Sequence, residues 1–191
     1  MSVASPEGWR RNPQLVLDFY NARRRQVLQV QPNKAHYDLS ALEKDHDVNI
    51  LTQNVDDLHE RAGSTNVIHL HGELLKARSV SDPDLTCHWT RDIQLGDSGL
   101  DGQQLRPHIV WFGESVPNMA VASRIVGQVD VVIIVGTSLQ VYPAAALVGY
   151  AQTSAHIFYV DQAPEISSLS SFGTRLTTIQ MKPQLRGGAM L

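Results

Sequence analysis

The sequence has one cysteine, no long apolar run and little net charge. A single thiol, Cys87, excludes an internal disulfide framework and a zinc site built from several cysteines. No stretch approaches the ~18 consecutive apolar residues of a membrane span, and residues 1–6 do not resemble a signal peptide. The net charge of −3 gives no general affinity for polyanions. We therefore predict a cytoplasmic protein that binds neither nucleic acid nor membrane.

The composition is that of a folded globular protein. Hydrophobic residues make up 42 % of the chain, which is enough to form a core and argues against disorder. The length of 191 residues fits one domain. We therefore predict a single domain over residues 1–191.

The most informative stretch is an apolar run that ends in short polar side chains. Residues 48–51 are typical of a buried strand, and Gln53, Asn54 and Asp56 follow it directly. In open α/β sheets, ligands bind beyond the carboxyl ends of the strands. These three side chains are therefore candidates for reading a polar small molecule.

A second short strand, residues 67–70, leads to a histidine beside a glycine. The imidazole of His71 can titrate near neutral pH and act as a general base. His69 lies on the same side of this strand because side chains alternate along a strand. Two histidines could bind a metal ion, but the sequence offers no obvious third ligand, so we predict no metal site.

A helical part, residues 12–46, precedes these strands. Asn12 and Pro13 are a typical helix start, and Tyr20 and Arg23 share a face of that helix because they are three residues apart. Two interpretations of this pair stay open. The face is solvated, or the phenol and the guanidinium together hold a carboxylate.

The pattern weakens over residues 77–104, where short polar residues surround isolated apolar ones such as Trp89 and Ile93. We interpret this segment as an inserted loop module. It is long for a bare connection, so function or mobility is expected of it.

The last third of the chain has the order strand, glycine turn, helix, strand and acidic residue. The apolar run 130–135 leads into Gly136, and Asp161 follows the strand predicted at 156–160. Such a glycine lets backbone amides approach phosphate or sugar, and such an acid accepts hydrogen bonds from ribose hydroxyls. Because the full G-x-G-x-x-G string is absent, an ordinary βαβ unit is an equal alternative.

The segment from Thr52 to Asp56, together with His71-Gly72-Glu73, resembles the sirtuins, the NAD-dependent protein lysine deacylases. The similarity runs from about Ser5 to about Lys182. It implies an α/β fold with a Rossmann-like, largely parallel sheet, helices on both faces and a small helical or loop insertion. It also implies NAD as the cofactor and acylated lysines of proteins as the substrate.

The resemblance assigns a role to each matching residue. His71 corresponds to the family's catalytic histidine, with Asn54 and Asp56 acting beside it, and Gln53 joins these two in the nicotinamide and ribose pocket. The adenosine side of NAD corresponds to Gly136, Thr137 and Ser138, and Asp161 stands where the family usually has an asparagine. The substrate tunnel corresponds to Val110, Trp111, Phe112, Gly113 and Glu114, with Val141 near the same groove.

Tyr20 and Arg23 resemble the tyrosine and arginine of the bacterial desuccinylase-like class, in which they form a wall of the acyl pocket. The resemblance therefore implies removal of succinyl, malonyl and acetyl groups by a monomer, which gives nicotinamide and O-acyl-ADP-ribose. Two features of the family are not represented. The first is the N-terminal Gly-Ala-Gly loop, and without it we expect the domain to be N-terminally incomplete. The second is the set of four zinc cysteines in the inserted module, and without them we expect no zinc. Two alternatives follow: a catalytically impaired fragment that binds ADP-ribose or acyl-peptide, and an ADP-ribosyltransferase.

Overall fold

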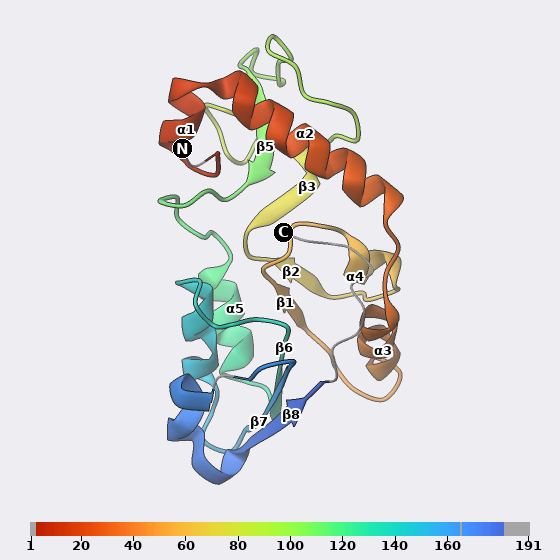
Figure 1. Cartoon of the computed structure of the whole chain (residues 1–191), viewed down its shortest axis with the longest axis vertical. Coiled ribbons are helices and arrows are strands. Elements are labelled where there is room, and N and C mark those ends of the chain that lie inside the picture. Colours follow the sequence, from red (N-terminus) through yellow and green to blue (C-terminus); the bar gives the residue numbers. More distant parts are fainter. Residues whose placement is uncertain (1–2, 165, 182–191) are drawn as a thin grey trace. The chain divides into compact units, whose positions relative to one another are not determined.

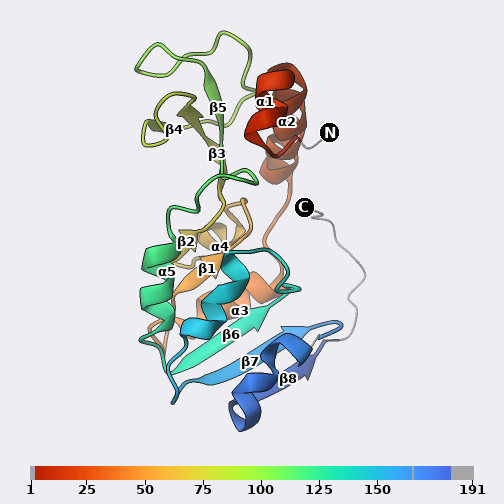
Figure 2. The same cartoon turned by 90° about the vertical axis from the view of Figure 1, so that its left-hand side faces the viewer.

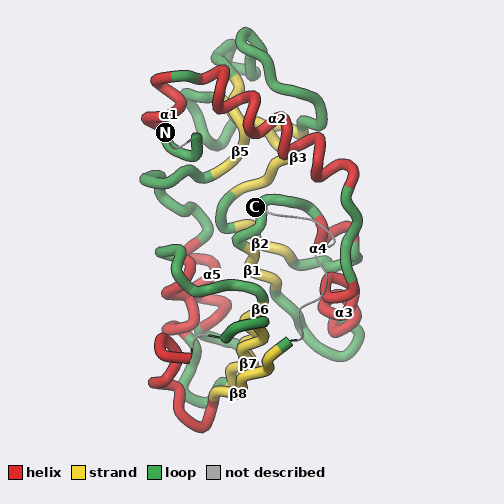
Figure 3. The backbone as a smooth tube through the Cα atoms, in the orientation of Figure 1, coloured by secondary structure: helices red, strands yellow, loops and turns green. Residues whose placement is uncertain are grey.

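The computed structural model describes residues 3–164 and 166–181 (Figure 1). The chain divides into two compact units, one ending at Val116 and the other beginning at Pro117. Figure 2 shows the elements of each unit from a second direction, and Figure 3 shows them as helix, strand and loop. None of the described helices is long and apolar enough to cross a membrane.

Side-chain caps set the helix starts of the first unit. The side chain of Asn12 accepts a hydrogen bond from the Leu15 amide at 3.0 Å, and that of Asn33 accepts one from the Ala35 amide at 2.9 Å. The helix start predicted at Asn12 is present, and a second helix begins after Asn33 within the predicted helical part 12–46. The first unit contains α1 (Pro6–Arg11), α2 (Pro13–Gln29), α3 (Lys34–Leu42) and α4 (Leu58–Arg61).

The first unit holds a parallel pair of strands and an antiparallel sheet. Strand β1 (Ile50–Thr52) runs parallel to β2 (Val67–His69), which confirms the two strands predicted there. Strand β3 (Gly72–Ser79) lies between β4 (Thr86–His88) and β5 (Leu105–Ile109), and both of these neighbours run antiparallel to it.

The antiparallel sheet was not predicted. The sequence indicates a loop from Ala77 and an extended segment at residues 109–112, whereas β3 continues to Ser79 and β5 ends at Ile109. The sheet depends on a close approach at Gly72, where an added Cβ would collide with the His108 carbonyl and φ is +85°. Only glycine fits such a position without strain.

Parallel strands build the second unit. Its elements are α5 (Met119–Val126), β6 (Val131–Val135), η1 (Ala144–Tyr150), β7 (His156–Asp161), η2 (Ile166–Arg175) and β8 (Leu176–Gln180). The strands lie in the order β6-β7-β8, all parallel, so the strands predicted at 130–135 and 156–160 are present. The helix expected between these two strands is the 3-10 helix η1, which follows Pro143. The core of this unit contains Ile134, Ile157, Tyr159 and Leu169.

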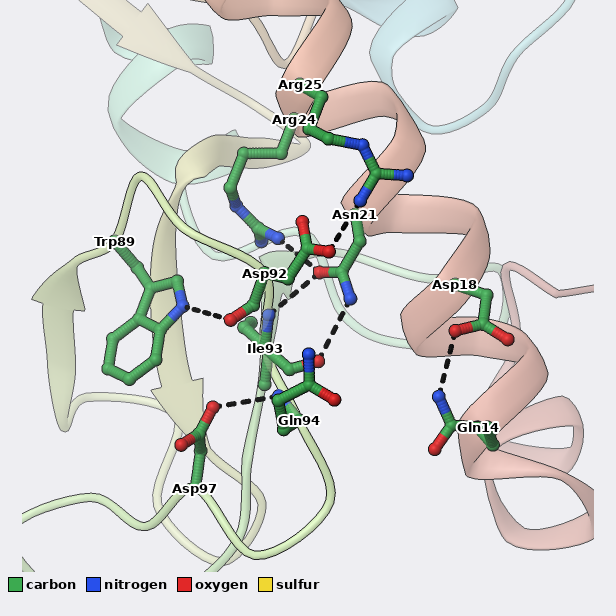
Figure 4. Close-up of polar contacts among 10 residues, drawn as sticks. All are labelled: Gln14, Asp18, Asn21, Arg24, Arg25, Trp89, Asp92, Ile93, Gln94 and Asp97. Atoms are coloured by element: carbon green, nitrogen blue, oxygen red, sulfur yellow. Dashed lines mark hydrogen bonds and ion pairs between the residues drawn. The ribbon is translucent and has the colours of Figure 1, made fainter.

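Helix α2 anchors the inserted module through one buried side chain (Figure 4). The amide of Asn21 bonds both backbone groups of Ile93: its nitrogen donates to the Ile93 carbonyl and its oxygen accepts from the Ile93 amide, each at 2.9 Å. Arg24 donates to the same Asn21 oxygen at 2.7 Å and to the Leu74 carbonyl at 2.8 Å. Ile93 itself is fully buried against Leu17, Ala77 and Leu105. Polar and apolar contacts thus hold this part of the module against α2 and its neighbours.

We expect Asn21→Ala to lower the free energy of unfolding by about 2–3 kcal/mol. The change leaves the two Ile93 backbone groups and the Arg24 guanidinium without their partner in a buried place. Urea denaturation followed by tryptophan fluorescence measures the effect. Gln14→Ala is the matched control, because Gln14 lies on the same helix and bonds Asp18 at the exposed surface. Equal losses in the two variants would contradict a specific anchor at Asn21.

Candidate active site

The loop after β1 is fixed by short hydrogen bonds. The Asn54 amide donates to Thr52 Oγ1 at 3.0 Å, and the Leu58 amide donates to Asp56 Oδ1 at 3.1 Å. The Val55 carbonyl accepts a bond of 2.7 Å from the amide of Leu74 in β3. The side chains of residues 53, 54 and 56 stay partly exposed. The loop therefore presents three polar side chains at the carboxyl end of β1, as predicted.

Helix α4 is shorter than the sequence indicates. A helix over residues 55–62 is predicted, but α4 covers only Leu58–Arg61. The carboxylate of Asp56 accepts a hydrogen bond from the Leu58 amide at the start of the helix. This local bond competes with helix formation and keeps the residues before Leu58 in the loop. Residues 53–57 remain irregular, so their side chains are not tied to a helical repeat.

His71 lies two residues beyond the end of β2, directly before β3, and is half-buried. Burial lowers the pKa of His71, and a hydrogen bond to the Gln53 backbone acts in the opposite direction without overcoming it. The imidazole is therefore neutral near pH 7. With one ring nitrogen donating to a carbonyl, the other is available to accept a proton.

The segment that follows β5 is attached to the backbone of His71. The Val110 amide donates to the His71 carbonyl at 2.9 Å. Trp111 is buried, whereas Phe112 is 70 % exposed and lies beside Gly113, whose φ is +91°. The structure therefore brings residues 110–114 next to His71, within one unit.

Glu114 closes this segment into a turn. Its carboxylate accepts from Arg106 at 2.7 Å, from Arg78 at 3.1 Å and from the Trp111 amide at 2.8 Å. Burial raises the pKa of Glu114, but the hydrogen bond from Arg106 and the neighbouring positive charges outweigh burial, so the pKa lies below its ordinary value. Glu114, predicted as part of the substrate tunnel, thus holds residues 111–114 in a turn in this structure.

Tyr20 and Arg23 lie on α2 with different degrees of burial. Tyr20 is 5 % exposed, and burial raises the pKa of its phenol to about 12, so the hydroxyl is a hydrogen-bond donor at neutral pH. Arg23 is half-buried, and its guanidinium lies 5.1 Å from the ring centroid of Phe19. Tyr20 is therefore not part of a solvated helix face, and only Arg23 of the pair has access to solvent.

His69 and Glu60 form a contact that the sequence analysis missed. The Nδ1 atom of His69 lies 3.2 Å from the Asn54 carbonyl oxygen, and its Nε2 atom lies 2.7 Å from Glu60 Oε1. Burial lowers the pKa of His69, but the hydrogen bond and charge of Glu60 outweigh it, so the pKa is raised. The only sequence signal for this contact is that His69 shares a strand side with His71.

A second pair of histidines lies on the neighbouring helices. The rings of His36 in α3 and His59 in α4 have centroids 4.7 Å apart. Burial lowers the pKa of both imidazoles. Among the residues described in the structure, no group of three or more histidine, cysteine, aspartate or glutamate side chains is arranged to hold a metal ion.

The second unit brings Gly136 and Asp161 to the same edge of its sheet. Gly136 directly follows β6, and Asp161 is the last residue of β7. These two strands are parallel neighbours, and Val135 lies opposite Val160. Gly136 has φ +61° and open space where a Cβ would be. The Thr137 carbonyl accepts from the Tyr159 hydroxyl at 3.1 Å, and Asp161 Oδ1 accepts from the Ala163 amide at 2.8 Å. Ser138 and Val141 are exposed in the loop after Gly136.

Each unit thus places polar side chains beyond the carboxyl ends of parallel strands, as nucleotide-binding α/β enzymes do. The Sir2 family model matches residues 1–143, and the chain belongs to this family, the sirtuins. The predicted family is therefore confirmed.

Curated relatives and solved structures agree with this assignment. The chain is 61 % identical over 161 residues to an NAD-dependent protein deacylase of Helicobacter pylori strain J99, which covers 84 % of this chain and 69 % of the relative. It is 50 % identical over 169 residues to an NAD-dependent protein deacylase of Bacteroides thetaiotaomicron, and the match covers 85 % of this chain and 72 % of the relative. A Sir2 homologue solved with NAD matches with a TM-score of 0.82 at 35 % identity, covering 92 % of this chain and 70 % of the other. The mixed α/β, Rossmann-like fold is confirmed. The roles of the individual site residues stay predictions.

Proposed function

We propose that this protein removes acyl groups from protein lysines with NAD, and that it takes succinyl and malonyl groups as well as acetyl. By its resemblance to relatives named NAD-dependent protein deacylases, the chain is an enzyme with NAD as cofactor. The products under this proposal are free lysine, nicotinamide and O-acyl-ADP-ribose. Its peptide substrate is supported by a structure of Sir2 bound to an acetylated peptide, which matches at 29 % identity with a TM-score of 0.79.

The observation that carries the proposal is the half-buried imidazole of His71, which lies between β2 and β3. Burial lowers the pKa of His71, so the ring is unprotonated and able to act as a base at physiological pH. Asn54 and Asp56 lie in the loop fixed beside it and would orient the reacting groups. His71 would take a proton from a ribose hydroxyl.

The polar residues beyond the strand ends of each unit suit groups that NAD carries. Gln53, Asn54 and Asp56 would face nicotinamide and its ribose. Gly136 has the left-handed φ and open surroundings that let a ligand approach its backbone, and Thr137, Ser138 and Asp161 would hold the adenosine side. When bound, NAD supplies a nicotinamide leaving group and a ribose whose hydroxyls take part in acyl transfer.

Acyl choice rests on α2. The phenol of Tyr20 stays protonated because burial raises its pKa to about 12. It can therefore donate to a carboxylate while Arg23 supplies charge and further donors. Succinyl- and malonyl-lysine carry such a carboxylate, and acetyl-lysine does not.

We expect Arg23→Met to lower kcat/KM for a succinylated peptide by about 10- to 100-fold. A hydrogen bond to a charged group contributes about 1.5–3 kcal/mol. The acetylated form of the same peptide should be affected much less, because it offers no charge to Arg23. Side-by-side kinetics on both peptides measure this difference.

Arg25→Met is the matched control. Arg25 belongs to the same basic run, but it pairs with Asp92 of the inserted module at the exposed surface, so both peptides should react as with the unchanged protein. If Arg23→Met lowers kcat/KM for both peptides by the same factor, Arg23 supports the fold and does not read the acyl group. The expected monomeric state and cytoplasmic location remain predictions.

A further inference from the structure

His69 joins the candidate active-site loop to helix α4. One ring nitrogen faces the carbonyl oxygen of Asn54 at 3.2 Å, and the other faces the carboxylate of Glu60 at 2.7 Å. The His69 side chain is 8 % exposed and that of Glu60 is 39 % exposed. The imidazole is therefore held between two partners in a largely buried position.

Both partners can only accept hydrogen bonds. A backbone carbonyl has no proton to give, and Glu60 is ionised because its hydrogen bond to His69 outweighs burial and lowers the pKa of the carboxyl. A neutral imidazole carries one N–H and can satisfy one acceptor, whereas an imidazolium carries two. Both acceptors, the Asn54 carbonyl and the Glu60 carboxylate, therefore receive a hydrogen bond from His69 only when both ring nitrogens are protonated.

The charges around His69 favour this protonated form. Glu60 of α4 and Glu73 of β3 both stabilise the imidazolium. His59 of α4 is the opposing group, but burial lowers the pKa of His59 and keeps it neutral at physiological pH. The strand next to β2 presents Thr52, an uncharged residue, opposite His69.

We propose that His69 and Glu60 are a positioning pair, which holds the Asn54 carbonyl, and with it the turn from Asn54 to Asp56, only while His69 is protonated. The kinetic part of this inference rests on the proposed deacylase function, because it concerns residues assigned to that reaction. The structural part does not depend on it. His69 touches no reacting atom under this proposal and acts through Asn54.

The proposal gives the two neighbouring histidines opposite roles. His71 must be neutral to act as a base, and its lowered pKa makes it so. His69 must be charged to hold the loop, and its raised pKa favours this. The stabilising contribution of His69 is present below its ordinary pKa and is lost as the pH rises through the raised one. Deacylation should therefore rise with pH as His71 loses its proton and fall again as His69 loses its own.

Two measurements on the full chain test the pair. Histidine ring NMR, which needs neither NAD nor substrate, should show His69 titrating at higher pH than His71, with both ring nitrogens protonated on the acid side. Glu60→Gln should move the His69 midpoint to lower pH and leave that of His71 in place. His88→Gln, at an exposed position in β4, is the control and should move neither midpoint.

The kinetic readout is the pH profile of kcat/KM. His69→Gln should lower the value about tenfold at neutral pH and remove the alkaline limb, because glutamine does not titrate. Glu60→Gln should shift this limb to lower pH. A merely structural role would lower the profile without changing its shape.

The possible outcomes separate the two ideas. If His69 titrates below His71, or if the alkaline limb persists in His69→Gln, the positioning pair is overturned while the deacylase function stands. If the NMR result is as expected but no acylated peptide is turned over, the proposed function fails and the pair remains supported.

Discussion

Replacing His71 with alanine is expected to lower kcat/KM for deacylation at least about 100-fold, because a positioned general base contributes about 10²–10⁴ in rate. In the proposed reaction, the imidazole of His71 would be the general base, and burial lowers its pKa so that it is neutral at physiological pH. The fold should remain intact. The contact that ties the next segment to this position, from the Val110 amide to the His71 carbonyl, is a backbone bond that alanine keeps.

The measurement is release of free lysine from an acylated peptide, with circular dichroism to verify the fold. His71→Gln is a useful companion, because its amide can still donate a hydrogen bond but cannot act as a base, so it should be nearly as inactive. His156→Ala is the matched control: this histidine bonds Thr177 in the second unit and should leave activity unchanged. Full activity of His71→Ala would remove His71 from the mechanism.

Local chemistry explains why much of the fold could be predicted. Asn12 and Asn33 cap helices through bonds within three residues, and such signals are visible in a short window of sequence. The strand after Asp130 is a continuous apolar run, which is typical of a parallel strand. Helix α1 was missed although Ser5 caps it with a bond to the Gly8 amide at 3.1 Å; the Ser-Pro start was a signal that could have found it.

The antiparallel sheet could not be predicted in the same way. Its register pairs Gly72 with Ile109, and Ala77 with Pro107 after an irregularity. These contacts join segments some thirty residues apart. The apolar run 109–112 looks like a strand, but Trp111 is buried instead by packing against Arg106, whose guanidinium carbon lies 3.2 Å from its ring centroid. The burial of Trp111 therefore reflects tertiary packing, whereas Ile109 at the start of the run is paired in β5 and Phe112 at its end is exposed.

The candidate site also has a part that local sequence predicts and a part that depends on contacts between distant elements. Polar residues after a buried strand indicate a binding site because topology brings strand ends together, so Gln53, Asn54 and Asp56 could be proposed from sequence. The partners of those residues come from other elements. Neither the pairing of His69 with Glu60 nor that of Glu114 with two arginines follows from a spacing in the sequence.

Glu114 deserves its own test because its predicted and observed surroundings differ. The resemblance assigns it to the substrate tunnel, whereas its carboxylate is bonded to Arg106, Arg78 and the Trp111 amide. The side chains of Arg106 and Arg78 are 8 % and 10 % exposed. Removing the negative charge therefore leaves two positive charges nearly buried without a counter-ion.

Glu114→Gln is expected to lower the free energy of unfolding of the first unit by about 3–5 kcal/mol, the cost of breaking a buried ion pair on one side. All three tryptophans, Trp9, Trp89 and Trp111, belong to this unit, so fluorescence during urea denaturation reports on it. Glu7→Gln is the control, because the pair of Glu7 with Arg11 is exposed and should contribute less than about 1 kcal/mol.

The pH dependence of stability distinguishes the two roles of Glu114 further. Because its pKa is depressed in the folded protein, Glu114 stabilises the unit above its ordinary pKa, and this contribution is lost as the pH falls through the depressed one. Glu114→Gln should therefore flatten the loss of stability in acid as well as lower stability at pH 7. A variant as stable as the unchanged protein at both pH values, yet with a raised KM for acylated peptide, would instead assign Glu114 to substrate binding.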